Sequence, residues 1–192
     1  RAQNPFGAAV TAERAAELKG RPYALDWLAT QQQADGGWSF AGDFPNPGTD
    51  SSRVKATSLV LLAFIGAGHT VEGPEQYRPA VKRGIAFLDK QFLAQADGRR
   101  EAGAGNNDLA SHAMAAIAVS EMYRRTRNRE LKPLAAGLLK QLLHLQDPQT
   151  GRWPEADAPV DPDHHVWPTV ALYSAAGARL RFPPDCLDRG RA

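Results

Sequence analysis

Two kinds of apolar pattern alternate along this chain. Some segments are apolar or small on nearly every side, namely 52–67, 107–125 and 165–180. Others, 74–93 and 130–146, carry an apolar stripe opposite charged residues. The first pattern is typical of a helix buried on most sides, and the second of a helix with one solvent-exposed face. The alternation predicts an inner and an outer layer of helices, with further helices at 8–19 and 23–33.

A second pattern recurs where helices end. Residues 32–38 read Gln-Gln-Ala-Asp-Gly-Gly-Trp, residues 95–98 read Gln-Ala-Asp-Gly, and residues 146–153 begin with Gln-Asp and end with Gly-Arg-Trp. Glycine adopts the backbone conformations that stop a helix and form a tight turn, and Trp38 is a large residue that can pack on the helix end. Three copies spaced by roughly 50–60 residues indicate a helical-hairpin repeat.

These patterns together predict an all-α fold. We expect one domain over residues 1–180, built from three repeats and a last inner helix, with a basic tail that has little regular structure. The approximate boundaries are 8–50, 51–107, 108–163 and 165–180 for the repeats and the last helix, and 181–192 for the tail.

Composition narrows the classes of partner. The 192 residues carry a net charge of only +2, which does not favour nucleic acid as a partner. The longest apolar run, Leu59–Ile65, is too short to span a bilayer. With one cysteine, Cys186, the chain cannot form an intrachain disulfide. We expect a soluble protein of unassigned compartment, extracytoplasmic if a signal peptide preceded Arg1.

The segment Gln32–Trp38 resembles the QW repeat of squalene–hopene cyclases and related terpene cyclases. The alternating helices resemble the α/α toroid that these enzymes share with protein prenyltransferase β-subunits. Segment 56–70 is similar to prenyltransferase/squalene-oxidase repeat proteins. The resemblance implies αα-hairpin repeats that form an open or incomplete toroid, because the closed rings of that family use more helices than this chain offers.

The resemblance also suggests one catalytic candidate. Cyclases use an Asp-x-Asp-Asp motif whose acid protonates an isoprenoid double bond, and Asp163 occupies the place of that acid. His164 stands where the last aspartate of the motif is expected. The alternative is structural: Asp50, Asp108 and Asp163 occupy equivalent places before the three inner helices, where an aspartate caps a helix.

Other candidates concern ligands. The resemblance to prenyltransferases implies an Asp-Cys-His zinc set, but Cys186 lies in no matching motif, so we expect no metal and no cofactor. The alternative is an oxygen and nitrogen metal site made of Asp161, Asp163, His164 and His165. The residues expected on a concave inner face are Val54, His112, Trp167 and Tyr173. For His112 the alternative is a core histidine bonded to a backbone carbonyl.

Three functions remain open at this point. The first is a non-catalytic repeat domain that binds a protein, a peptide or an apolar ligand on its concave face, or that self-associates to close the arc. The second is a terpene cyclase or prenyltransferase-type enzyme acting on isoprenoids, degenerate or completed by a partner, with Asp163 as the acid. The third is a carbohydrate-active α/α toroid, which would need paired carboxylates across a cleft.

Overall fold

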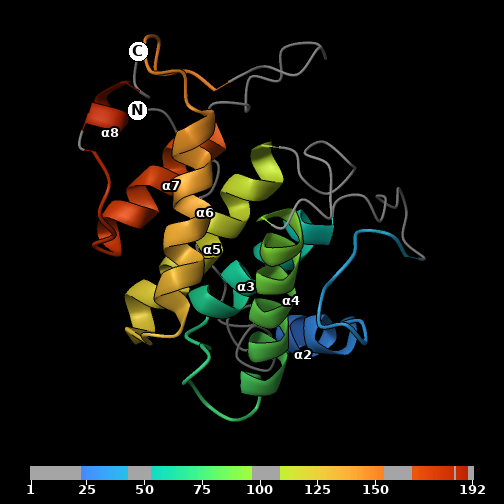
Figure 1. The fold of residues 1–192 in the computed structure, drawn as a ribbon. Helices are drawn as coiled ribbons and strands as arrows, with labels where there is room; N and C mark the ends of the chain where they lie inside the picture. Colours follow the sequence, from blue (N-terminus) through green and yellow to red (C-terminus); the bar gives the residue numbers. More distant parts are fainter. Residues whose placement is uncertain (1–22, 43–52, 97–108, 154–165, 184, 190–192) are drawn as a thin grey trace, which may run out of the picture. The chain divides into compact units, whose positions relative to one another are not determined.

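The computed structural model describes residues 23–42, 53–96, 109–153, 166–183 and 185–189. Within these ranges the regular structure is helical and no strand occurs, so the predicted all-α class is confirmed for this part of the chain (Figure 1). The helices are α2 (Tyr23–Thr30), α3 (Arg53–Gly66), α4 (Arg78–Ala96), α5 (Leu109–Thr126), α6 (Leu131–Leu145), α7 (Val166–Gly177) and α8 (Asp185–Arg189). The helix expected at 8–19 lies outside the described residues.

The chain divides into two compact units, residues 1–31 and 32–192. In the first unit the described element is α2. This helix ends where the Thr30 hydroxyl donates a hydrogen bond to the Trp27 carbonyl at 2.7 Å. Trp27 itself is 49% exposed.

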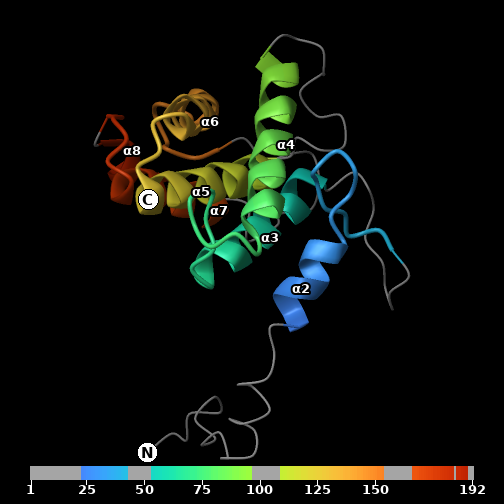
Figure 2. The ribbon, with the colours of Figure 1, turned by 90° about the horizontal axis from the view of Figure 1, so that it is seen from below.

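Helix α5 is the centre of the second unit. Every residue from Ser111 to Ser120 is buried, as its small and apolar sequence predicts. The helix packs against α3, α6 and α7, and Figure 2 shows α6 on one side of it and α7 on the other. Its alanines leave little side-chain volume between neighbouring backbones, so several helices pack closely around it.

The amphipathic helix α6 covers α5 with one stripe. The buried positions of α6 repeat at the helical period: Leu131, Leu134, Ala135, Leu138, Leu139 and Leu142. Lys132 and Lys140, between these positions, are exposed. Helix α4 packs in the same unit against α3, with Val81, Ile85 and Leu88 buried.

Most helix ends lie within three residues of the predicted ones. The largest difference is at α4, which begins at Arg78 rather than at residue 74, because residues 75–77 form a turn first. Helix α7 ends at Gly177 rather than at residue 180. There Arg179 has a φ of 60°, and the Leu180 N–H donates back to the Ala175 carbonyl at 3.0 Å, a common way to end a helix.

The expected lack of regular structure in the tail is wrong for Asp185–Arg189, which form α8. Cys186 in this helix is only 4% exposed, and its carbonyl accepts a hydrogen bond from the Gln146 amide at 3.2 Å. A tertiary contact therefore organises a segment whose own composition is typical of a loose end. No helix in the described ranges is long and apolar enough to cross a membrane.

Candidate functional site

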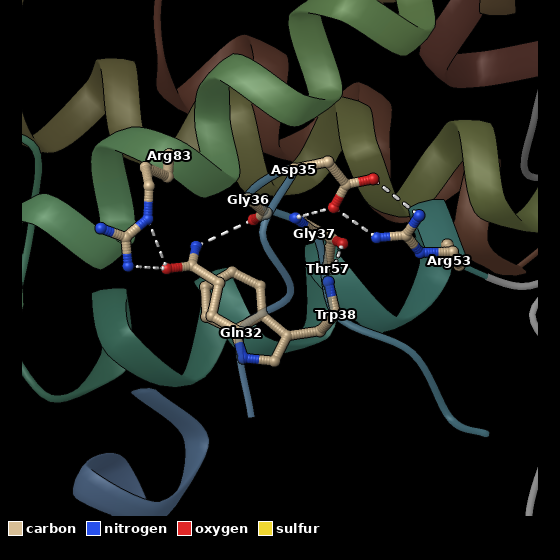
Figure 3. Close-up of polar contacts among 8 residues, drawn as sticks. All are labelled: Gln32, Asp35, Gly36, Gly37, Trp38, Arg53, Thr57 and Arg83. Atoms are coloured by element: carbon tan, nitrogen blue, oxygen red, sulfur yellow. Dashed lines mark hydrogen bonds and ion pairs between the residues drawn. The ribbon is translucent and has the colours of Figure 1, made fainter. Parts of the chain in front are cut away.

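The first helix-ending turn, residues 32–38, is held by the side-chain amide of Gln32 (Figure 3). Its Nε2 donates to the carbonyl oxygens of Gly36 and Ala80, each at 2.8 Å. Its Oε1 accepts from Nε and Nη2 of Arg83, at 3.0 and 2.5 Å. Both amide donors and the amide oxygen are in use, so Gln32 ties the turn to the first turns of α4.

Asp35 closes the other side of this turn. Its Oδ1 accepts from the Gly37 N–H at 3.1 Å, and its two oxygens receive Nη1 and Nη2 of Arg53 at 2.7 and 2.6 Å. The hydrogen bond from Arg53 is the main reason that the pKa of Asp35 lies below its ordinary value. Arg53 also stacks 4.8 Å from the ring centroid of Phe87. Asp35 is thus an ionised, paired carboxylate at neutral pH and unsuited to donating a proton.

Trp38 completes the turn as a buried residue, 2% exposed. The backbone N–H of Trp38 donates to the Thr57 hydroxyl at 2.9 Å, and the ring centroids of Trp38 and Phe64 lie 6.2 Å apart. Thr57 and Phe64 both belong to α3. On α4, a Cβ added to Gly84 would lie 2.8 Å from a ring atom of Trp38. The glycine therefore lets α4 approach the tryptophan closely, and Trp38 packs between α3 and α4.

Of the two other copies, the glycine turn after Gln95 lies outside the described residues. The copy at residues 146–153, the second turn that the structure describes, repeats the glutamine contacts. Gln146 is 6% exposed, and its Nε2 donates to the Gly151 carbonyl at 2.9 Å as well as to that of Cys186 on α8. Gly36 and Gly151 each lie two residues before the tryptophan of their turn, and both have a positive φ, 91° and 71°. Gln146, Gly151 and Cys186 thus occupy the places of Gln32, Gly36 and Ala80.

The backbone of the two turns agrees as well. In the first turn, the Gln33 N–H donates to the Gly37 carbonyl at 2.9 Å. In the second, the Asp147 N–H donates to the backbone carbonyl of Arg152 at 2.7 Å. Trp153 is 2% exposed, like Trp38. Its indole N–H donates to the Leu142 carbonyl at 2.9 Å. The same local structure therefore follows α2 and α6, although the second turn is one residue longer.

His112 and Val54 lie together, on the sides of α5 and α3 that face the amphipathic helices. Both line a small crevice completed by α4 and α6, with Leu88, Gln91, Phe92, Ala115 and Leu138. His112 is 8% exposed, and its Nε2 lies 2.8 Å from the Leu138 carbonyl. Because a carbonyl only accepts, the neutral ring carries its proton on Nε2. Burial lowers the pKa of His112, which favours this neutral form.

Trp167 and Tyr173 lie elsewhere. Trp167, near the start of α7, is half-buried, and Tyr173 is 44% exposed. Neither lines the crevice that holds His112 and Val54. The four residues expected on one face thus do not converge on one site within the described part of the chain.

The catalytic candidate Asp163 lies outside the described residues, and so do Asp50, Asp108, Asp161, His164 and His165. No group of three side chains able to hold a metal ion occurs among the residues that the structure describes. Comparisons with protein-family profiles, with curated proteins and with solved structures found no match for this chain.

The sequence pattern did not single out the two arginines, one on α3 and one on α4, that contact the first turn. Arg53 and Arg83 lie 18 and 51 residues from their partners Asp35 and Gln32. One signal was available: Arg83-Gly84 follows Ala80 at the spacing at which Arg189-Gly190 follows Cys186. Since Ala80 and Cys186 accept the two glutamine amides, this repeated dipeptide marks equivalent places in the chain.

Proposed function

We propose that this chain is a non-catalytic α/α repeat domain, an incomplete toroid, that binds a protein partner through the exposed apolar side of α7. The matched contacts of the 32–38 and 146–153 turns support the repeat. The two turns follow α2 and α6 in the chain. In each, the glutamine amide donates a hydrogen bond to a backbone carbonyl of a later helix, Ala80 of α4 for Gln32 and Cys186 of α8 for Gln146.

The observation that carries the binding function is that α7 is apolar on two opposite sides. Pro168, Ala171, Leu172 and Ala175 are buried. Val166, Val170 and Tyr173 are 48%, 38% and 44% exposed. At about 100° of rotation per residue these three share a stripe opposite the buried one. An apolar stripe open to solvent is typical of an interaction surface.

Helix α3 shows the same feature on a smaller scale. Leu59 is 36% exposed. It lies opposite Thr57 and Leu61, which contact the residues of the first turn and α4. In the proposed toroid the exposed sides of α3 and α7 belong to the inner helices, which is where open helical arrays bind their partners.

A paired capture experiment tests this proposal. Wild-type protein and a Val170→Asp/Tyr173→Asp variant are immobilised, and the proteins retained from a lysate of the source organism are quantified. The control is Lys140→Asp on α6, which changes the net charge by the same two units at an exposed position. We expect a partner that binds wild type and Lys140→Asp equally and the double variant at least about tenfold more weakly, when reconstituted from purified components.

Binding that is equal in all three proteins would refute the proposed surface. Self-association through the same stripe is a distinct outcome, seen as a dimer of wild type by light scattering that the double variant lacks. The enzymatic alternative is tested separately, by incubation with squalene or farnesyl diphosphate. A cyclised or prenylated product that is lost in Asp163→Asn would establish catalysis and overturn the non-catalytic proposal.

A further inference from the structure

The exposed apolar stripe of α7, made of Val166, Val170 and Tyr173, ends beside an arginine. Gly177 continues the stripe at the same helical spacing and is exposed as well. A Cβ added to Gly177 would lie 3.4 Å from Cδ of Arg124, which belongs to the last turn of α5. The side chain of Arg124 therefore adjoins the C-terminal end of the stripe.

Further arginines gather at the same end of α7. Nη1 of Arg127 donates to the Ala178 carbonyl at 2.8 Å, so the segment that follows α5 contacts the segment that follows α7. The exposed arginines of these two segments and of the last turn of α5 form one cluster: Arg124, Arg125, Arg127, Arg129, Arg179 and Arg181. The carboxylates in the same stretches of chain are Glu121, which pairs with Arg124 at 2.8 Å, and Glu130. The arginines thus clearly outnumber the carboxylates.

The fold itself accounts for only part of this positive charge. Helix C-termini carry partial negative charge, and both α5 and α7 end here. Each end is equivalent to about half an elementary charge, so the two ends together balance about one arginine. Helix α7 has no charged residue over its 12 positions. The surface therefore combines an uncharged apolar stripe with an excess of positive charge at one of its ends.

We propose that the partner of the α7 stripe, whose existence rests on the function proposed above, is a protein segment with apolar side chains at one end and several carboxylates at the other. The apolar side chains cover the stripe, and the carboxylates lie over the arginine cluster. Charge complementarity of this kind fixes the direction in which a segment binds.

The position of the charge argues against two other polyanions. A helix that lies on a membrane carries basic residues along its polar face, and nucleic acid presents phosphates along its whole length. Either surface would match cations spread beside the stripe. On α7 the cations lie at one end only, and Val166, Val170 and Tyr173 have no charged neighbour within their own helix.

The probe is a labelled helical peptide with leucines at positions i, i+4 and i+7, followed by four glutamates. Its dissociation constant is measured by fluorescence anisotropy at low and at physiological salt. Two matched peptides carry glutamine in place of glutamate or serine in place of leucine. We expect the parent peptide to bind at least about fivefold more tightly than either, and the advantage given by the glutamates to shrink as salt rises.

Paired variants test whether the cluster is where the carboxylates bind. We expect Arg124→Gln/Arg179→Gln to weaken binding of the parent peptide about fivefold and to leave binding of the glutamine peptide unchanged, which also shows that the fold is retained. Lysine at both positions is expected to keep most of the affinity. The control is Lys82→Gln/Lys140→Gln, an equal loss of charge at exposed positions of α4 and α6, and it is expected to have no effect.

The outcomes separate this proposal from the function on which it rests. If the glutamates add no affinity, but the glutamine peptide binds and is lost in Val170→Asp/Tyr173→Asp, the site on α7 stands and the acidic end is refuted. Equal weakening by the arginine and lysine pairs would also refute it. An oligonucleotide or phosphatidylserine vesicles that bind the cluster more tightly than the parent peptide would assign it to a different partner. Absence of binding of any peptide at ~1 mM would overturn the proposal.

Discussion

At the scale of single residues, the Gln32 side chain takes part in more hydrogen bonds than any other side chain described in the first turn. Gln32→Ala leaves the Gly36 and Ala80 carbonyls and the Arg83 guanidinium without this partner. We expect the free energy of unfolding to fall by about 2 kcal/mol, measured by urea denaturation. Gln31→Ala is the control, because Gln31 is exposed and its side chain donates only to the Thr30 hydroxyl at 3.3 Å. Equal losses in the two variants would show that the amide contacts do not stabilise the turn.

His112 makes stability depend on pH. Because burial lowers its pKa in the folded protein, the unfolded chain binds the proton more tightly, and stability rises with pH. The stabilisation is complete above the ordinary value of 6.5 and decreases as pH falls below it, by at most about 1.4 kcal/mol per pH unit. Urea denaturation between about pH 5 and 8 measures this slope. We expect His112→Gln to have a smaller slope over this range, and identical slopes would contradict the argument.

Residue types in the turns were predictable, but their partners were not. Glutamine, glycine and tryptophan repeat at a helix end, and this pattern indicates a structural role before any fold is known. The ion pair of Asp35 with Arg53 depends on how α3 approaches the turn, which local patterns do not encode. For the same reason the sequence left His112 with two interpretations, and its contact with Leu138 across two helices shows that it bonds to a backbone carbonyl.

At the scale of elements, the 32–38 turn depends on a glycine for two separate reasons. Gly36 has a φ of 91°, and a Cβ there would lie 2.5 Å from the Arg83 carbonyl oxygen. Gly68, which ends α3 with a φ of 89°, has nothing within 4 Å of its added Cβ. Gly68→Ala therefore incurs only the backbone cost of about 1–2 kcal/mol. We expect Gly36→Ala to cost at least about 1 kcal/mol more because of the clash, measured by urea denaturation of both variants.

Equal destabilisation by the two alanines would show that the approach of α4 to the turn is readily relaxed.

The helices themselves were predictable because burial imposes a period of 3.6 residues, visible in the leucines of α6. Helix ends were less predictable, since α7 ends at Gly177 and the positive φ in the turn after it belongs to Arg179, not to a glycine. The short helix α8 has no such period, and its order comes from the contact of Cys186 with Gln146.

At the scale of the whole molecule, the alternation of apolar patterns correctly predicted that α5 is buried on most sides, but the same prediction is wrong for α7, where Val166, Val170 and Tyr173 are exposed. The alternation did not predict the directions of individual side chains. Val54 and His112 face the amphipathic helices, whereas Tyr173, expected on the same face, lies on the exposed side of α7. Helical rotation relates positions within one helix, but the packing of each helix against its neighbours decides which side is covered.

The two matched turns also allow a test of whether residues 32–192 unfold together. Trp38 and Trp153 are each 2% exposed, whereas Trp27 is 49% exposed and Trp167 is half-buried. In a Trp27→Phe/Trp167→Phe variant, fluorescence therefore reports on the two turns alone. Both turns belong to the unit whose central helix, α5, packs against three others. We expect fluorescence and far-ultraviolet circular dichroism to give one coincident urea midpoint, because loss of α5 packing exposes both tryptophans. A tryptophan transition at lower urea than the loss of helix would instead show that a turn opens while the helices stay packed.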